Sequence, residues 1–236
     1  MTNEVMRNII RQPTSGIDFR EVMDSGKILL VNLSKGKLGD VNAFMLGMII
    51  VAKLTTAALS RQELPEDQRR DFYLYVDEFQ NIATDTFATI LSEARKYRLC
   101  LNVTHQFIAQ LPEDVRNAVF GNVGTLISYR VGVDDAKYLA SQFAPVFNEN
   151  DLLNIDRYNA YVKCIVDNAP QRPFSLRVLR DETPPNDALR NAIVELSNLK
   201  HGKDRHEIDA LIRQRAQIGE SVGAMDAVAP SEGRAA

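Results

Sequence analysis

The sequence predicts an α/β protein in which a doubly wound, mostly parallel sheet carries helices on both faces. Apolar runs of strand length, among them residues 72–76 and 99–103, alternate with helical stretches and short polar segments. Consecutive apolar residues are typical of strands buried on both faces, as in parallel sheets. The alternation of strand and helix then favours a doubly wound arrangement.

The expected strands of the main sheet are residues 27–33, 72–76, 99–103 and 123–131. Each has the length of a strand and is bounded by glycine or by polar turn residues. Further along, residues 159–166 alternate between apolar and polar side chains, and residues 173–179 follow a proline-containing turn. This pattern predicts an antiparallel hairpin at the edge of the sheet.

Helices are expected where apolar residues recur at helical spacing. In the stretch 85–97 the side chains of Phe87, Ile90 and Ala94 share one face, and Thr84 or Asp85 marks its start. The other expected helices are residues 38–62, with Asp40 as N-cap or first-turn acid, and residues 115–120, 134–143, 149–153, 186–199 and 205–216, after shorter elements within residues 1–25.

The composition and the Pro184-Pro185 pair divide the chain into three expected segments. Residues 1–183 form the α/β domain, residues 184–217 a helical extension after a Pro-Pro break, and residues 218–236 a disordered tail rich in Gly, Ala and Ser. The 236 residues are 45% hydrophobic and 25% charged, as is usual for globular proteins. The net charge of −3 argues against a wholly basic nucleic-acid-coating protein but not against a local basic patch.

Two adjacent acids, Asp77 and Glu78, directly follow the 72–76 strand. The carboxyl ends of parallel strands are where open α/β sheets bind ligands. An Asp-Glu pair there is typical of the second half of a P-loop ATPase site, where the Asp associates with Mg²⁺ and the Glu polarises the attacking water. The motif alone is weakly specific, and the alternative is a helix-capping acid pair.

The neighbouring strand, residues 99–103, ends in Thr104, His105 and Gln106. A polar residue in this place, Gln106, is suited to contact a γ-phosphate, although it could instead cap the next helix. His105 is expected to be a partly buried imidazole, because no second metal ligand is spaced near it.

The sequence LYVDEFQNIATDTFATILSEARKYRLCLNVTHQFIAQL, residues 74–111, resembles the part of TraG/TraD-like conjugative coupling ATPases that follows the P-loop. These are motor components of type IV secretion, within the FtsK–HerA superfamily of hexameric DNA pumps. Residues 121–143 resemble the next strand and helix of the same superfamily. The resemblance covers approximately residues 25–180. It implies a RecA-like domain that binds ATP and Mg²⁺, forms a homo-hexamer, contacts DNA without reading its sequence, and works with other type IV secretion components.

Carried over by position, the resemblance implies that Asp77 is the Mg²⁺-associated acid, Glu78 the catalytic base and Gln106 the γ-phosphate sensor. Arg95 matches a position that the family uses as an arginine finger on the neighbouring subunit's nucleotide. The alternative for Arg95 is a solvated cation at a helix end. Weaker candidates for the same interface are Arg116 and Arg130.

No GxxxxGK[ST] motif occurs in the 236 residues. Without the amide cradle and lysine of that motif, little holds the β- and γ-phosphates. The chain is therefore expected to be the post-P-loop half of an ATP-driven DNA-translocating motor, an ATPase when complete and inactive alone. The alternative is a catalytically inactive RecA-like module that serves as a binding or assembly partner. The expected location is the cytoplasm, at the inner face of the membrane in a complete protein whose N-terminal region would carry any anchor.

Lys35 and Lys37 lie in a small loop, residues 34–39, that follows the expected 27–33 strand. In a ring this loop could contact DNA backbone phosphates without reading sequence. A solvated turn is equally consistent with the pattern.

Overall fold

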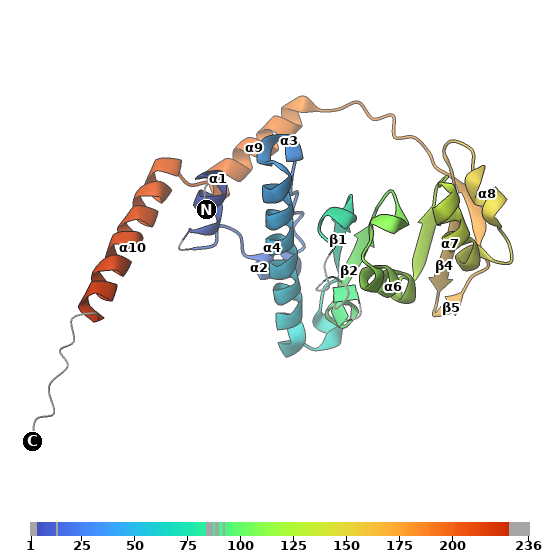
Figure 1. Ribbon diagram of the computed structural model, residues 1–236, viewed down its shortest axis with the longest axis horizontal. Helices are drawn as coiled ribbons and strands as arrows, with labels where there is room; N and C mark the ends of the chain where they lie inside the picture. Colours follow the sequence, from blue (N-terminus) through green and yellow to red (C-terminus); the bar gives the residue numbers. More distant parts are fainter. Residues whose placement is uncertain (1–3, 13, 84–86, 88–89, 92, 227–236) are drawn as a thin grey trace, which may run out of the picture. The chain divides into compact units, whose positions relative to one another are not determined.

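The computed structural model describes residues 4–12, 14–83, 87, 90–91 and 93–226. These residues form two compact units, one of residues 19–183 and one built from both ends of the chain, up to Asp18 and from Pro184 onward. All the assigned strands belong to the first unit (Figure 1). This grouping differs from the expected division, which assigned the first eighteen residues to the α/β domain.

A parallel pair of strands, β1 (Phe72–Val76) and β2 (Leu99–Val103), forms the first sheet. Residues pair in register from Phe72 opposite Leu99 to Val76 opposite Val103, which confirms the predicted parallel strands. Side chains alternate along β1, however, and Tyr73 and Tyr75 are 57% and 74% exposed. The prediction that this strand is buried on both faces is therefore wrong for the described part of the chain.

The hydrophobic core of this unit packs against the other side chains of β1 and β2. The long helix α4 (Asp40–Leu59) and the helix α6 (Glu113–Asn122) cover it. Their buried residues include Val51, Leu54, Ala57, Ala58, Val115 and Val119. Residues 40–63 are long and apolar enough to cross a membrane. This is weak evidence for a membrane helix, because Leu54 and Ala58 are buried in the core of this unit.

A second, antiparallel sheet contains β3 (Thr125–Ser128), β4 (Asn159–Val166), β5 (Ala169–Pro170) and β6 (Phe174–Arg177). The pairing of β4 with β6 confirms the predicted hairpin. The strand expected at residues 123–131 is shorter than predicted, and it pairs antiparallel with β4 instead of extending the parallel sheet. The helices α7 (Val133–Phe143) and α8 (Glu149–Leu153) supply the buried side chains that pack with this sheet. The fold is thus mixed α/β with separate parallel and antiparallel sheets.

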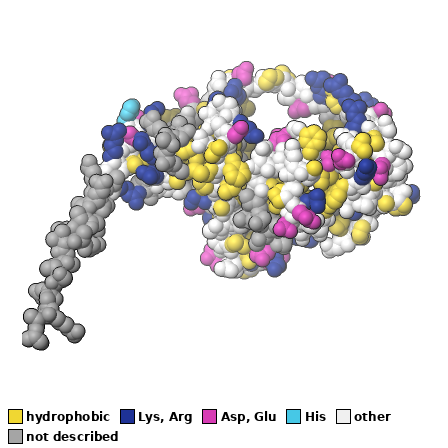
Figure 2. Space-filling view, in the orientation of Figure 1, with side chains coloured by type: hydrophobic (Ala, Val, Ile, Leu, Met, Phe, Trp, Pro, Cys, Tyr) yellow, Lys and Arg dark blue, Asp and Glu magenta, His cyan; other side chains and the backbone are white. Residues whose placement is uncertain are grey.

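Residues 27–33 do not form a strand, contrary to the prediction. Ile28 and Leu30 are 88% and 77% exposed. A strand requires a hydrogen-bonded neighbour, and within the described residues β1 pairs only with β2. Hydrophobic side chains also reach the surface elsewhere, interspersed with charged ones (Figure 2). The apolar composition of residues 27–33 was therefore not sufficient to specify a strand.

The remaining helices mostly begin where the sequence predicts. They are α1 (Glu4–Ile10), α2 (Phe19–Asp24), α3 (Lys35–Leu38), α9 (Asp187–His201) and α10 (Arg205–Asp226), with 3-10 turns η1 (Ser60–Glu63), η2 (Glu66–Gln68), η3 (Phe79–Asn81), η4 (Ala94–Tyr97) and η5 (Ile108–Gln110). Because α10 continues to Asp226, the tail predicted to be disordered from residue 218 is helical in its first part. The predicted helix start at Thr84 or Asp85 lies outside the described residues.

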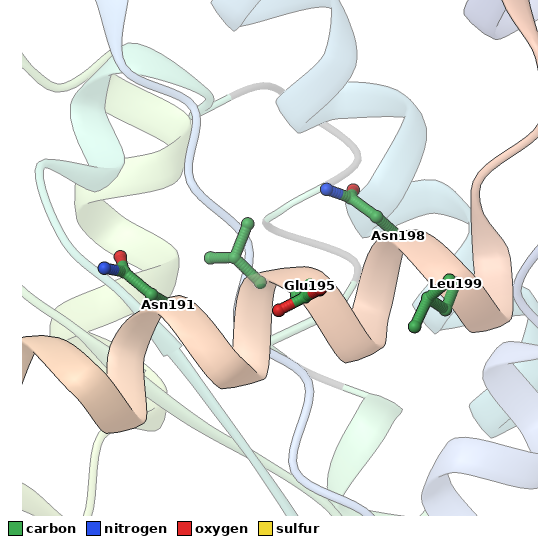
Figure 3. A pocket seen from close by; sticks show the side chains of 5 residues that line it. Asn191, Glu195, Asn198 and Leu199 are labelled. Carbon is green, nitrogen blue, oxygen red and sulfur yellow. The ribbon is translucent and has the colours of Figure 1, made fainter.

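The unit formed by the chain ends is held by contacts between α1 and α10. Met6, Ile208 and Ile212 are its buried side chains, and Arg7 forms an ion pair with Asp209. By contrast, every residue of α9 is exposed. An open hollow along α9 is lined by Asn191, Val194, Glu195, Asn198 and Leu199, which all belong to this one helix (Figure 3). The hollow is therefore a helix surface and contains none of the predicted site residues.

Arg61 is fully buried and connects three parts of the α/β unit. Its Nε lies 2.9 Å from Asp24 Oδ1 at the end of α2. Its Nη1 donates to the carbonyl of Arg70, before β1, at 2.9 Å and to the carbonyl of Tyr97, in η4, at 3.1 Å. A planar guanidinium can hold three acceptors in fixed directions, which an ammonium group cannot.

We expect Arg61→Lys to lower the free energy of unfolding by about 2 kcal/mol or more, because the lysine keeps the charge but leaves buried carbonyls without donors. Arg130 is exposed, so Arg130→Lys should change stability by less than about 0.5 kcal/mol. Chemical denaturation of both variants measures the difference. Equal stabilities would show that the Arg61 bonds do not hold the unit together.

The backbone turns sharply where β1 ends. Glu78 has φ 51° and ψ 47°, the left-handed region that non-glycine residues avoid. Such strain persists where the surroundings impose it, and it is concentrated at functional sites.

Comparing Glu78→Ala with Glu78→Gly isolates this backbone strain, because both substitutions remove the carboxylate. We expect the glycine variant to be more stable by about 1 kcal/mol, since glycine adopts positive φ without a steric penalty. Denaturant titration of the two variants measures the difference. An alanine variant as stable as the glycine variant would show that the left-handed turn is absent.

Candidate functional site

The parallel register brings Asp77 and Thr104 together at the carboxyl ends of β1 and β2. The Thr104 N–H donates to the carbonyl of Val76 at 3.0 Å, and the Phe79 N–H donates to the carbonyl of Thr104 at 2.9 Å. These backbone bonds continue the ladder past the strand ends. The Thr104 hydroxyl donates to Asp77 Oδ1 at 2.5 Å and so orients that carboxylate. Asp77 itself is exposed.

Both carboxylate oxygens of Glu78 accept hydrogen bonds from neutral amides. Gln106 Nε2 donates to Glu78 Oε1 at 2.5 Å, and Gln80 Nε2 donates to Glu78 Oε2 at 2.5 Å. Each carboxylate oxygen has a second lone pair, so Glu78 can accept further hydrogen bonds, from water for example. The structure therefore brings together three of the predicted site residues, Asp77, Glu78 and Gln106.

The side chain of Asn81 connects the acid turn, residues 77–81, to the predicted basic loop at residues 34–39. Its Nδ2 donates to the carbonyl of Glu78 at 3.0 Å, and its Oδ1 accepts from Lys35 Nζ at 3.0 Å. Lys35 and Lys37 both belong to α3 and are exposed. Of these two lysines, only Lys35 reaches the acid turn within the described structure.

Arg95 lies at the other end of the strands. It is an exposed residue of η4, which directly precedes β2, whereas Glu78 follows β1. Five-residue strands at about 3.3 Å per residue separate these two ends by roughly 15 Å. Arg95 is therefore not brought to Glu78 of its own chain. The carbonyls of the residues next to it are held by arginines: Arg69 Nη1 donates to Lys96 O at 2.6 Å, and Arg61 donates to Tyr97 O.

The two weaker arginine candidates have other surroundings in the described structure. Arg116 is half-buried, with its guanidinium 5.5 Å from the ring centroid of Tyr138. Arg130 is exposed in the segment after β3. Neither forms a hydrogen bond with Asp77 or Glu78 in the described structure.

His105 is partly buried against Phe79. Its ring contacts Phe79 edge-on at 5.4 Å between centroids. Burial lowers the pKa of His105, and the nearby carboxylates of Asp135 and Glu78 only partly oppose this effect. Among the described residues, no group of three or more His, Cys, Asp and Glu side chains could hold a metal ion. The partial burial of His105 agrees with the expectation.

The oxygen atoms at this sheet edge suit a Mg²⁺ ion whose remaining ligands are water or phosphate. Asp77, Glu78 and Thr104 offer carboxylate and hydroxyl oxygens, the hard ligands that Mg²⁺ prefers. Because no full cage is present among the described residues, an ion here would be bound through few protein oxygens, with water or phosphate completing the octahedron. The donor set thus fits Mg²⁺ carried with a phosphate ligand.

Sequence reasoning assigned no role to Thr104, Gln80 or Asn81. Thr104 directly follows β2, whereas Gln80 and Asn81 lie in the short turn η3 after β1, and this closeness to the strand ends was the available signal. Their partners became visible only with the left-handed turn at Glu78, which aims the carboxylate between Gln80 and Gln106.

Sixteen chains of known structure match this protein. The bacterial conjugative coupling protein TrwBdeltaN70, in its unbound monoclinic form, is 18% identical over 56% of this chain and 36% of its own, with a TM-score of 0.45. The plasmid coupling protein TrwB in complex with ADP and Mg²⁺ is 17% identical over 63% of this chain and 38% of its own, with a TM-score of 0.48. The complex of TrwB with the non-hydrolysable ATP analogue ADPNP is 18% identical over 58% of this chain and 38% of its own, with a TM-score of 0.46. The chain spans a little over a third of the length of these structures.

A comparison with curated proteins gave no match. Residues 71–145, however, match a protein family described as the TraM recognition site of TraD and TraG. The match contains β1, β2, the acid turn, Arg95 and Gln106, which are the residues on which the resemblance rested. Over residues 71–145 the chain is therefore similar to the TraD and TraG proteins for which this family is described.

Proposed function

We propose that this chain supplies the acid-bearing part of the ATP-driven motor of a conjugative coupling protein. The observation that carries the proposal is the arrangement of Glu78, which sits in a strained turn at a strand end with both carboxylate oxygens held by amides. Strained backbone and oriented carboxylates are characteristic of catalytic sites. The family match over residues 71–145 supports the same reading.

In this proposal each residue at the sheet edge has a defined task. Asp77, oriented by Thr104, would associate with Mg²⁺, which when bound with ATP neutralises charge on the phosphates. Glu78 would accept a hydrogen bond from the attacking water and orient it. Gln106 would link the position of Glu78 to the γ-phosphate, since its amide already contacts Glu78. Residues 19–183 would then form the C-terminal part of a RecA-like, doubly wound P-loop domain.

Arg95 would act on the nucleotide of a neighbouring subunit in a homo-hexamer. Its distance from Glu78 in the same chain, roughly 15 Å along the strands, supports a role in trans rather than in cis. Lys35 and Lys37 are exposed and would contact DNA backbone phosphates. The assembly would work on the cytoplasmic side of the membrane together with other type IV secretion components.

A second function is favoured by the description of the matched family. Residues 71–145 match a region named for recognition of TraM. The exposed side chains of β1, Tyr73 and Tyr75, are aromatic, and such residues are enriched in protein interfaces. A catalytically inactive module that binds a TraM-like partner is therefore the alternative to a motor part.

Joining a P-loop segment of a coupling ATPase ahead of residues 1–236 tests the motor proposal. We expect the joined protein to hydrolyse ATP faster when DNA is added, and Glu78→Gln to lower kcat at least about 100-fold, because the amide cannot act as the base. Steady-state phosphate release measures both. An Arg95→Ala protein should also be inactive, whereas its mixture with the Glu78→Gln protein should regain activity at interfaces that combine intact Glu78 and intact Arg95.

Lys96→Ala serves as the matched control for Arg95→Ala, because Lys96 is the next exposed cation of the same turn. This control should retain activity. A joined protein without turnover on any DNA would reject the motor proposal and leave the binding module. Activity of the Arg95→Ala protein equal to that of the Lys96→Ala control would remove Arg95 from the site.

A further inference from the structure

The link from Lys35 through Asn81 to Glu78 joins two parts of the unit that the proposed function treats separately. Lys35 belongs to the basic turn, defined here as residues 34–38, and Glu78 to the acid turn, residues 77–81. The Lys35 ammonium donates to Asn81 Oδ1, and Asn81 Nδ2 donates to the carbonyl of Glu78, each at 3.0 Å. An ammonium can only donate and a carbonyl can only accept, so the orientation of the Asn81 amide is fixed by its two partners.

The two turns are also packed tightly behind this link. Gly47 of α4 lies where a Cβ atom would stand 2.7 Å from Ile82 Cγ2 and 3.3 Å from Leu33 Cδ1. Leu33 directly precedes the basic turn, and Ile82 directly follows the acid turn. At Gly47 there is thus no room for a side chain, so α4 packs closely against the residues that flank both turns.

Lys35 is available to a ligand. Its side chain is 56% exposed, and its nearest carboxylate, Asp40 Oδ1, is 3.9 Å away and itself 81% exposed. Its closest partner is thus a neutral amide oxygen. A phosphate oxygen is charged whereas the Asn81 oxygen is neutral, so the Lys35 ammonium is attracted more strongly to a phosphate than to Asn81. A phosphate group that reaches the basic turn would therefore compete effectively for Lys35.

We propose that Lys35 is a positioning residue for Glu78, acting through Asn81, and that a phosphate group bound at the basic turn draws Lys35 away and releases the Glu78 carbonyl from this restraint. The proposal rests on the proposed role of Glu78 as the base. Phosphate binding at one turn would then be reported at the other, as a change in how firmly the strained Glu78 turn is held. The phosphate can belong to a DNA backbone or to a nucleotide.

Nuclear magnetic resonance of the isotopically labelled full chain tests this link without requiring ATP turnover. The readouts are the side-chain amide of Asn81 and the backbone amide of Glu78. We expect Lys35→Met to shift both signals, Lys35→Arg to restore them, and Lys37→Met, the matched control in the same turn, to leave them in place. Unchanged signals in the Lys35→Met protein, or equal changes in the Lys37→Met protein, would overturn the proposal.

Two probes, each added alone, then distinguish the source of the phosphate. A short single-stranded DNA oligonucleotide tests the backbone, and inorganic triphosphate with Mg²⁺ tests the nucleotide. At least one probe should shift the Asn81 and Glu78 signals of the unmodified chain, and the shift should be lost in Lys35→Met. No shift with either probe would overturn the phosphate response. The experiment on the joined protein measures ATP turnover, whereas this experiment measures the Lys35–Asn81–Glu78 link. Failure of the proposed function can therefore be distinguished from failure of the proposed link.

Discussion

The parallel pairing of β1 with β2 is the interaction on which the candidate site depends. The register that sets Val76 opposite Val103 places the next residues, Asp77 and Thr104, side by side. Two more backbone hydrogen bonds beyond the strands fix them there. A shift of the register by one residue would turn every side chain of β1 to the other face. It would bury Tyr73 and Tyr75 and separate the acids from Thr104 and Gln106.

The left-handed turn at Glu78 directs its carboxylate toward Gln80 and Gln106. Without positive φ at that residue, the chain would leave β1 in another direction, and the carboxylate would not meet both Gln80 and Gln106. Conformational strain in the backbone is thus offset by hydrogen bonds to the side chain and to the carbonyl of the same residue. This is how a residue unsuited to the left-handed region is held where its carboxylate is useful.

The sequence was sufficient to predict that Asp77, Glu78 and Gln106 meet at the sheet edge, but not that Thr104, Gln80 and Asn81 hold them there. Asp77 and Gln106 each follow an apolar run, and the carboxyl ends of parallel strands lie at one edge. The sequence was not sufficient for features that depend on distant partners. Residues 27–33 have the composition of a strand but lack a hydrogen-bonded neighbour among the described residues, and residues 125–128 joined the antiparallel sheet. The link between Lys35 and Asn81 spans 46 positions and has no local signature.

In the proposed motor, Mg²⁺ and the phosphates of ATP bind at the carboxyl ends of β1 and β2. Paramagnetic Mn²⁺, used in place of Mg²⁺ with ATP, broadens the magnetic resonance signals of nearby nuclei. The test is made on the joined protein, whose added P-loop segment supplies the phosphate cradle that residues 1–236 do not contain. We expect the amide signals of Glu78, Thr104 and Gln106 to broaden first, while those of Arg98 and Leu99, at the other end of β2, stay sharp. Broadening spread evenly over exposed carboxylates, or centred on another acidic surface, would contradict this expectation.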